Sequence, residues 1–432
     1  MGEFVSRTGI VTHAPCDLRE SAMSSTTRPA LAMFILVGAA LALAAADANA
    51  GPKAYVGNFA DSTVSAVDTE AGKIVATIPV AAGPHGMAIT ADGRTVFVSG
   101  DGSSSVSVID TATDTVAKTI EVGKTPNGVT LTPDGRLLLV TVYGDNKIVF
   151  VDTATQSVVG EAAIARPHTI SIAPGGKLAY VTSQEPGHFG LAVLDLAARS
   201  VTKTIPLEKT PRDGEFGDGK FFYFTQAGVP AVQVLDPATD KVVGEIPTGV
   251  SPHSIYISGG TGFIVVQGPG ELTLFDPQAN KTTRSIAVGK QPHWAVVSDD
   301  GKTAYVTNEG SNDLMMISLA DGKTTTIAVG KAPRKVVVQG ANSKRANLGA
   351  TNVSIANFAF TPGVITVRRG TSVTWTNDDG SPHAVAFKDT SPGTTSLLPH
   401  HSFSRAFNEA GAFEYFCSFH PYMTAKVVVT AE

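Results

Sequence analysis

The stretch PNGVTLTPDGRLLLVTVYGDNKIVFVD, residues 126–152, contains the pattern that decides the fold of most of this chain. It begins with a proline, continues with an apolar segment, an Asp-Gly turn and a second apolar segment, and closes with a third that ends in aspartate. These short alternating segments predict β-strands at Gly128–Thr132, Leu137–Val142 and Ile148–Asp152. A fourth strand is expected at Ser157–Ile164.

The same pattern recurs with a period of about 42 residues. The aspartate of the third strand stands at Asp68, Asp110, Asp152, Asp195, Asp236 and Asp276, with Ser318 in the seventh place. The opening proline stands at Pro84, Pro126, Pro167, Pro211, Pro252, Pro292 and Pro333. Seven repeats of four short strands predict an all-β fold, a seven-bladed β-propeller over residues 51–339.

The phase of the repeat also predicts how the propeller closes. The chain enters at Tyr55 with a second strand and leaves at Val336–Gln339 with a first strand, so the last strand should complete the first blade and cover its edge. The segments Ala54–Asn58 and Ala304–Asn308 resemble the YVTN-type propeller repeat family. That resemblance implies the fold and leaves the function open, because such propellers serve as enzymes, binding platforms and surface proteins.

The composition suits a turn-rich, well-buried β protein, with 43 glycines, 25 prolines, 43% hydrophobic and 16% charged residues. The net charge is −5. We expect no nucleic-acid partner, because such binding needs clustered lysine and arginine. Two cysteines are too few for a disulfide framework, so each thiol needs its own explanation.

The position after the repeat proline is polar in every repeat. It holds His85, Asn127, His168, Arg212, His253, His293 and Arg334. Loops of a propeller run inward over one face, so the four imidazoles should converge on one funnel. Neutral imidazole suits copper, zinc or iron, and the two arginines are placed to hold an anionic substrate.

A metal site in the propeller, holding additional copper on His85, His168, His253 and His293, is therefore one hypothesis. One ion shared by all four would have to be bound across the channel. The alternative hypothesis is that the repeat favours histidine at this loop position, with each ring hydrogen-bonded to a neighbouring carbonyl.

Residues 1–50 are expected to be a leader. A positive charge at Arg28, an apolar run over Ala30–Ala46 and the sequence Ala48–Ala50 have the order of a secretory signal peptide. The alternative is an N-terminal membrane anchor, although the apolar run is shorter than the roughly 20 residues that span a bilayer. We expect a periplasmic or secreted mature chain with no membrane span.

Loss of the leader removes Cys16 and leaves Cys417 as the single cysteine. In an oxidising compartment a lone thiol is a chemical liability, so the sulfur of Cys417 should be occupied. After a polar, small-residue linker at 340–350, strand patterns resume without the 42-residue period. They predict a Greek-key β-sandwich of seven or eight strands over residues 351–432.

The sandwich carries a set of potential metal ligands. Cys417, His420 and Met423 stand in a Cys-x-x-His-x-x-Met segment, and His383 lies earlier in the chain. Two imidazoles, a thiolate and a distant thioether are the ligands of type-1 copper in electron-transfer sites. The alternatives are a buried free cysteine beside incidental histidines, and a zinc site, which rarely uses methionine.

The motifs Trp375-Thr-Asn377, Pro382-His383 and Tyr415-x-Cys417-x-x-His420-Pro421-x-Met423 resemble the cupredoxin family, particularly its amicyanin-like and pseudoazurin-like members. The resemblance covers about residues 351–430. It implies one type-1 copper ion, and it implies that Asn377 ties the two ligand loops together by hydrogen bonds.

A closed site of this kind passes single electrons and binds no substrate. An apolar patch around His420 is expected to dock a redox protein, such as a c-type cytochrome or another copper protein; it would consist of Pro382, Phe419, Pro421 and Tyr422. The segment Pro399-His400-His401 is expected to be a solvated turn, with an auxiliary copper-loading site as the alternative.

A propeller followed by a cupredoxin domain resembles the nitrous oxide reductases in order and architecture. Their binuclear copper centre needs two cysteines in the cupredoxin loop, and here Cys417 stands alone, so that activity is not expected. Three hypotheses follow: a copper-dependent oxidoreductase with a second metal site in the funnel, a pure electron carrier whose propeller docks partners, and an envelope scaffold.

Overall fold

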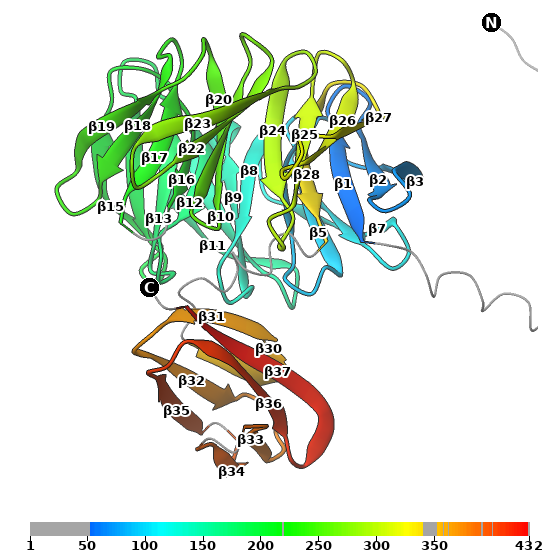
Figure 1. Cartoon of the computed structure of the whole chain (residues 1–432), viewed down its shortest axis with the longest axis vertical. Coiled ribbons are helices and arrows are strands. Elements are labelled where there is room, and N and C mark those ends of the chain that lie inside the picture. The colour runs from blue at the N-terminus through cyan, green and yellow to red at the C-terminus, as the bar shows by residue number, and fades with distance from the viewer. Residues whose placement is uncertain are drawn as a thin grey trace, which may run out of the picture. The chain divides into compact units, whose positions relative to one another are not determined.

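The computed structural model describes residues 52–217, 220–339, 352–356, 358–361, 363–389, 392–399 and 401–430. These residues form β-strands, joined by turns and one short 3₁₀ turn, η1 (Tyr143–Asp145) (Figure 1). The expected leader, the expected linker and His400 lie outside them. Within the described ranges, no helix has the length and apolar character that crossing a bilayer requires.

The part of the chain from Pro52 to Gln339 forms four-stranded antiparallel sheets, one for each sequence repeat (Figure 1). The strands of the first sheet, named in the order in which they lie side by side, are β28 (Pro333–Val338), β1 (Lys53–Asn58), β2 (Thr63–Asp68) and β3 (Lys73–Pro79). The second and third consist of β4 (Pro84–Ile89), β5 (Thr95–Gly100), β6 (Ser105–Asp110) and β7 (Thr115–Glu121), and of β8 (Pro126–Leu131), β9 (Leu137–Val142), β10 (Lys147–Asp152) and β11 (Ser157–Ala163). The fourth and fifth consist of β12 (Pro167–Ile172), β13 (Leu178–Ser183), β14 (Gly190–Asp195) and β15 (Ser200–Pro206), and of β16 (Pro211–Phe216), β17 (Phe222–Gln226), β18 (Ala231–Asp236) and β19 (Lys241–Pro247). The last two consist of β20 (Pro252–Ser258), β21 (Thr261–Val266), β22 (Glu271–Asp276) and β23 (Lys281–Ala287), and of β24 (Pro292–Val297), β25 (Thr303–Asn308), β26 (Asp313–Ser318) and β27 (Thr324–Ala328).

The first sheet joins the two ends of this region. Strand β1 pairs with β28 in antiparallel register, with Ala54 opposite Val338 and Tyr55 opposite Val337. The backbone N–H of Lys53 also donates to Oε1 of Gln339 at 2.9 Å. The prediction that the last strand completes the first blade is confirmed, and the edge of β1 is covered.

The repeat aspartate has a local structural reason. It ends the third strand of its sheet, and its carboxylate accepts hydrogen bonds from backbone N–H groups two or three residues later, as Asp110 does from Ala112 at 2.8 Å and Thr113 at 3.2 Å. Such Asx turns suit aspartate because its short side chain reaches its own backbone.

The first strands of the sheets line the middle of the region. They contact one another in the order β4, β8, β12, β16, β20, β24 and β28, and β28 contacts β4. The register of each shifts just after the repeat proline, as between Pro84 and Met87 or between Pro252 and Ile255. Such bulges re-aim side chains, and the polar repeat position lies inside them.

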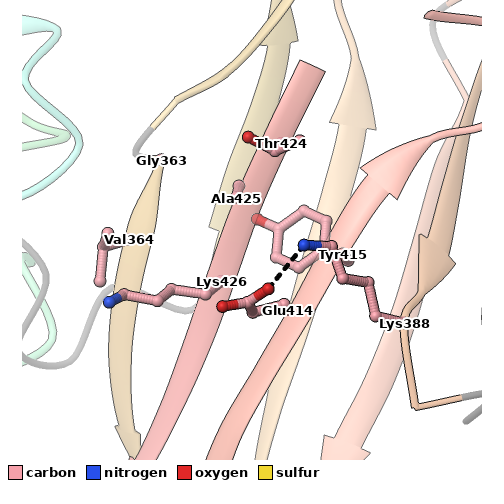
Figure 2. A pocket seen from close by; sticks show the side chains of 8 residues that line it. All are labelled: Gly363, Val364, Lys388, Glu414, Tyr415, Thr424, Ala425 and Lys426. Carbon is pink, nitrogen blue, oxygen red and sulfur yellow. Dashed lines mark hydrogen bonds and ion pairs between the residues drawn. The ribbon is translucent and has the colours of Figure 1, made fainter. Parts of the chain in front are cut away.

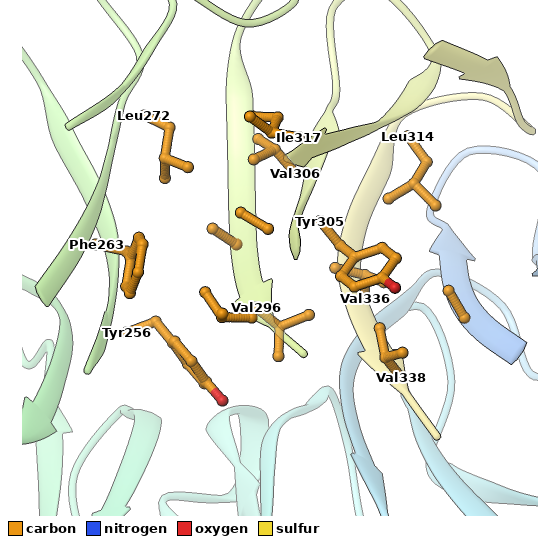
Figure 3. Close-up of a cluster of buried hydrophobic side chains, with 14 of the residues drawn as sticks. Tyr256, Phe263, Leu272, Val296, Tyr305, Val306, Leu314, Ile317, Val336 and Val338 are labelled. Carbon is orange, nitrogen blue, oxygen red and sulfur yellow. The ribbon is translucent and has the colours of Figure 1, made fainter. Parts of the chain in front are cut away.

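Apolar side chains fill the space between neighbouring sheets. Figure 3 shows one cluster, in which Leu272, Val296, Val306 and Val336 come from four different strands. Each of these four side chains is buried. Tight packing between successive sheets holds the inner strands, and therefore the repeat positions, in place.

The C-terminal region forms two sheets. One contains β30 (Ala359–Thr361), β29 (Asn352–Ala356), β32 (Thr371–Asn377) and β35 (Ser402–Phe407). The other contains β31 (Val364–Arg368), β37 (His420–Thr430), β36 (Gly411–Cys417), β33 (His383–Phe387) and β34 (Thr394–Leu397). Trp375, Phe407 and Tyr415 are fully buried in the single core of these sheets.

The strands expected from the sequence are present, and two short ones, β30 and β34, add to them. Neither was expected, because three or four residues carry too little alternation to be distinguished from turns. The last strand, β37, begins at His420. Cys417 and His420 therefore face each other across a tight hairpin.

Candidate metal centre

The hairpin between β36 and β37 and the start of β33 bring three of the expected ligands together. Cys417 is the last residue of β36, His420 the first of β37 and His383 the first of β33. Strands β33 and β36 pair side by side, with Ala386 opposite Phe416. This pairing places His383, 34 residues earlier in the chain, beside the sulfur.

The distances within the cluster match those expected around one ion. Sγ of Cys417 lies 3.6 Å from Nδ1 of His383 and 3.6 Å from Nδ1 of His420. Metal–sulfur and metal–nitrogen bonds of about 2.3 and 2.0 Å separate two such ligand atoms by roughly 3.5 to 3.8 Å. His383, Cys417 and His420 each offer a ligand atom, and these three atoms lie within 4.8 Å of one another. Among the described residues, they form the group of three or more His, Cys, Asp or Glu side chains that meets this criterion.

The cluster is shielded from water on one side. Cys417 and His383 are fully buried, Met423 is 2% exposed, and His420 is half-buried. Within the part of the chain that the structure describes, Cys417 has no disulfide partner, and the backbone N–H of Ala384 donates to its sulfur at 3.3 Å. The donor set of two imidazoles and a thiol, with the thioether of Met423 buried in the same core, therefore fits copper.

Asp379 holds the ring of His383 from the other side. Its Oδ2 lies 2.9 Å from Nε2 of His383 and also accepts the backbone N–H of Phe358 at 3.0 Å. Because Nδ1 of His383 faces the sulfur, Nε2 carries the proton and donates to the carboxylate. Second-shell bonds of this type fix the tautomer and orientation of a metal ligand.

Phe358 covers both imidazoles. Its ring packs edge-on against His420 at 4.9 Å and against His383 at 5.6 Å between ring centroids. Sequence reasoning missed Phe358 and Asp379. For Asp379 a signal existed, a carboxylate four residues before a candidate ligand, whereas for Phe358 there was none, because the contact forms only when distant strands meet.

Asn377 does part of what the family resemblance implied. Its Nδ2 donates to the carbonyls of Ser381 and Leu397, both at 2.8 Å, and its Oδ1 accepts the N–H of Asp379 at 3.0 Å. These bonds brace the loop before His383. Among the described residues, none of these side-chain bonds reaches the hairpin of Cys417, so the expected link between the two ligand loops is wrong.

The surface near His420 is apolar. Phe419 is 52% exposed and Tyr422 is 72% exposed, and Pro382 and Pro421 are exposed as well. The ring centroid of Tyr422 lies 6.0 Å from that of His420. Earlier in the chain, Nδ1 of exposed His401 donates to the carbonyl of Pro399 at 2.9 Å, which suits the solvated turn.

A separate pocket in this domain involves none of the expected ligands. Figure 2 shows its lining, in which Lys388 pairs with Glu414 at 2.7 Å. That ion pair is exposed, and the hydrogen bond from the lysine lowers the pKa of the Glu414 carboxyl. An exposed pair of this kind has little energetic weight and no ligand role follows from it.

The propeller histidines meet in one group. Ring centroids lie 5.6 Å apart for His85 and His168, 6.1 Å for His85 and His293, and 4.3 Å for His253 and His293. His293 is 7% exposed, and the other three are half-buried. Convergence of the four imidazoles, expected from the repeat, is thus present, and the cluster spans the channel.

Hydrogen bonding divides these histidines into two kinds. Nδ1 of His168 donates to the carbonyl of Arg212 at 3.1 Å, and Nδ1 of His253 donates to the carbonyl of His293 at 3.2 Å. Nδ1 of His85 and Nδ1 of His293 are buried without a hydrogen-bond partner among the described residues. The hypothesis that the repeat simply favours histidine predicted that each ring is hydrogen-bonded to a neighbouring carbonyl. His168 and His253 have such a bond, whereas His85 and His293 do not.

Burial keeps the four rings neutral. It lowers the pKa of His168 to about 4 and that of His253 to about 3, and it lowers the pKa values of His85 and His293 well below the usual range. Neighbouring imidazoles and Arg334 add to this effect by charge repulsion. Neutral imidazoles keep a lone pair available at physiological pH.

The two arginines expected to bind an anion already have protein partners. Arg212 donates to Ser251 at 3.2 Å and to Gln267 at 3.3 Å. Arg334 lies 3.5 Å from Glu309, and its guanidinium lies over the ring of Phe59. These contacts reduce what either side chain could offer a substrate.

Comparisons with known proteins agree with both parts of the structure. A family profile described as YNCE-like beta-propeller matches residues 10–134, and one described as copper binding proteins of the plastocyanin/azurin family matches residues 348–430. Hydrazine synthase of Kuenenia stuttgartiensis is similar in structure, with a TM-score of 0.57 and 22% identity over 62% of this chain and 92% of that chain. At that identity the likeness concerns the fold alone.

Two curated relatives resemble the C-terminal region. Amicyanin-alpha of Methylorubrum extorquens is 37% identical over 92 residues, which are 20% of this chain and 76% of the relative. Amicyanin of Paracoccus versutus is 34% identical over 85 residues, 18% of this chain and 64% of the relative, so this chain spans under two-thirds of that protein. Through residues 348–430 the chain therefore belongs to the plastocyanin/azurin family of copper-binding proteins, joined here to a YNCE-like β-propeller.

Proposed function

We propose that this protein carries single electrons in the periplasm through a type-1 copper site held by His383, Cys417, His420 and Met423. The observation that carries the proposal is the equal spacing of both Nδ1 atoms from the Cys417 sulfur, 3.6 Å each. A copper ion bound by such ligands cycles between two oxidation states and exchanges one electron.

The residues around the cluster suit fast electron exchange, because they hold the ligands rigidly. Asn377 braces the loop before His383, and Asp379 fixes the orientation of that ring. The N–H of Ala384 donates to the Cys417 sulfur and so stabilises a thiolate. Ligands that cannot relax keep one geometry in both oxidation states, which lowers the reorganisation that each transfer requires.

His420 is the proposed exit for the electron. It is the half-buried ligand, whereas His383 and Cys417 are fully buried. The exposed rings of Phe419 and Tyr422 next to it form an apolar surface on which a partner can exclude water. The proposed partner is a redox protein, such as a c-type cytochrome or another copper protein.

The remaining parts of the proposal concern the whole chain. Residues 1–50 act as a leader that exports the protein, residues 51–339 close as a seven-bladed propeller, residues 340–350 link the domains, and residues 351–432 form the cupredoxin domain. The ring of contacts from β4 to β28 and back supports the blade number. A part in a copper-dependent oxidoreductase would depend on the propeller, where the histidines of the inner strands meet.

The test is the colour of the copper-loaded protein. A thiolate bound to Cu²⁺ gives an intense visible charge-transfer band, which Cys417→Ser should abolish. His401→Gln is the matched control, since it changes an exposed histidine of the same domain outside the cluster. A colourless oxidised copper form of the unaltered chain would reject the type-1 site.

A further inference from the structure

Unpartnered polar atoms gather at the repeat position of the inner strands. Within the described residues, the buried side-chain atoms without a hydrogen-bond partner include His85 Nδ1, Asn127 Oδ1, His293 Nδ1 and Arg334 Nε. All four belong to the residue that follows a repeat proline. Buried polar groups in native proteins nearly always have hydrogen-bond partners. A cluster of buried polar atoms without such partners therefore indicates a bound ligand or water, which the chain itself does not supply.

The cupredoxin domain provides a yardstick for the spacing of these rings. There, the imidazoles of His383 and His420 lie 5.0 Å apart between ring centroids. The neighbouring pairs in the propeller, at 4.3, 5.6 and 6.1 Å, bracket that value. Two imidazoles bound to one ion at about 2.0 Å have ring centroids roughly 4.5 to 6.5 Å apart, depending on the angle between them. The two pairs that include His85 fall within this range, whereas the rings of His253 and His293 lie slightly closer together.

The hydrogen bonds determine which nitrogens are available. Because His168 and His253 donate through Nδ1 to backbone carbonyls, each leaves the lone pair of Nε2 free. His85 and His293 instead leave Nδ1 unpartnered. In the structure, no three ligand nitrogens of these four rings lie within 4.8 Å of one another. Rotation of the rings about their terminal side-chain torsion, which is soft in histidine, is therefore needed to bring the nitrogens around one ion.

Charges of both signs lie near the rings, and repulsion from Arg334, Arg212 and Lys335 lowers the pKa values of the imidazoles. Arg212, Arg334 and Lys335 are the cations around the rings, and each has a partner: Ser251 and Gln267, Glu309, and the ring of Trp294, respectively. Negative charge lies as close, since Oε2 of Glu309 is 3.9 Å from Nε2 of His293. Most cationic groups that could bind an anion already contact other protein groups. The imidazole nitrogens, by contrast, have lone pairs that are available to a metal ion.

A surface pocket lies beside the cluster. Its lining includes Ser251, Gln267, Gln291 and Glu309. Glu309 contacts His293, and Ser251 and Gln267 accept hydrogen bonds from Arg212. The pocket therefore borders the cluster through Glu309.

We infer that the centre of the propeller binds one transition-metal ion of the class that prefers imidazole nitrogen, copper or zinc, with His85 and His293 at the core of the site and His168 and His253 beside them. This site is independent of the copper ion proposed in the cupredoxin domain. Imidazole ligands suit both metals, and the absence of a thiol from the described cluster argues against a cuprous site of the thiolate type.

The test uses the full chain carrying Cys417→Ala, which removes the thiolate of the other site. The protein is stripped with a chelator, loaded with Cu²⁺ or with Zn²⁺, desalted and analysed for metal content, and the Cu²⁺ form is examined by electron paramagnetic resonance. We expect about one ion retained per chain, with hyperfine splitting from imidazole nitrogens. His85→Gln with His293→Gln should reduce retention to background.

The matched control is His188→Gln, an exposed histidine of the propeller outside the cluster, which should retain the ion. If the double variant fails to fold by circular dichroism, half-buried His85→Gln alone serves, and retention should fall at least tenfold. Background metal in the Cys417→Ala chain, or equal retention in the glutamine variants, would overturn the site. The visible band of chains that keep Cys417 reports on the cupredoxin copper separately.

Discussion

Asp379 accepts a hydrogen bond from Nε2 of His383 at 2.9 Å, on the side of the ring opposite the Cys417 sulfur. The carboxylate adds negative charge close to the bound metal without touching it. That charge makes the imidazole a stronger donor and stabilises the more positive oxidation state.

Asp379→Asn should therefore lower the affinity for Cu²⁺ roughly 10- to 100-fold and raise the reduction potential by about 60 to 120 mV. A redox titration followed through the visible band measures the shift. Glu414→Gln, which removes an exposed carboxylate of the same domain, is the control and should leave the potential unchanged. An unaltered potential in Asp379→Asn would mean that the carboxylate has only a structural role.

Met423 is buried in the same core as Cys417, and its thioether is the proposed axial ligand. Met423→Leu keeps the volume, so its cost in unfolding free energy should stay below about 1.5 kcal/mol. Copper should remain bound, while the reduction potential rises and the shape of the visible spectrum changes because the sulfur donor is gone. An identical spectrum and potential would exclude Met423 as a ligand.

Tyr422, 72% exposed next to His420, should matter for the partner and not for the metal. With a reduced c-type cytochrome as the probe, Tyr422→Ala should lower the second-order rate of electron transfer about tenfold, the effect of losing roughly 1.4 kcal/mol at an interface hot spot. Stopped-flow spectroscopy measures the rate. Val243→Ala, at a 54% exposed site of β19, is the control and should leave the rate unchanged. Equal rates in the two variants would show that Tyr422 is not part of the docking surface.

Asp213 gives the propeller a pH-dependent stability. Burial raises the pKa of this carboxyl to about 6, even though the N–H of Ile255 donates to it at 3.0 Å. The folded state thus holds the proton more tightly than the unfolded state, whose carboxyl titrates near 4. This contribution to stability is complete below pH 4 and is lost as the pH rises to about 6.

Asp213→Asn keeps a hydrogen-bond acceptor and cannot ionise. Between pH 4 and 6, the unfolding free energy of the unaltered chain should fall relative to that of the variant by up to about 1.4 kcal/mol per pH unit. Chemical denaturation at several pH values gives the difference. Parallel curves for the unaltered chain and Asp213→Asn would contradict the assignment.

The sequence predicted those features that local patterns determine. The spacing of prolines and aspartates indicated the repeat, and the phase of the strands at Tyr55 and Val336 indicated the closure by β28. The Cys-x-x-His segment identified the hairpin ligands because those residues are close in the chain.

Contacts between distant segments could not be predicted in this way. Phe358, which follows β29, contacts His420 only after β29 and β37 have taken their places in two different sheets, and no sequence pattern near either residue indicates this contact. The difference between His168, which donates to a carbonyl, and His85, which does not, depends on small rotations of rings at equivalent repeat positions. The sequence repeat predicts where these side chains lie in each blade, but it does not predict the orientation of the individual rings.

The pairing of β1 with β28 also bears on how the chain reaches this structure. Lys53 and Gln339, which bond each other, are 286 residues apart in sequence, so the first sheet stays incomplete until nearly all of the propeller has been synthesised. Closing so long a loop is slow compared with forming hairpins such as β2–β3. The rate of folding should therefore be governed by this one late event, and until it occurs the open edge of β1 is the place most vulnerable to pairing with another chain.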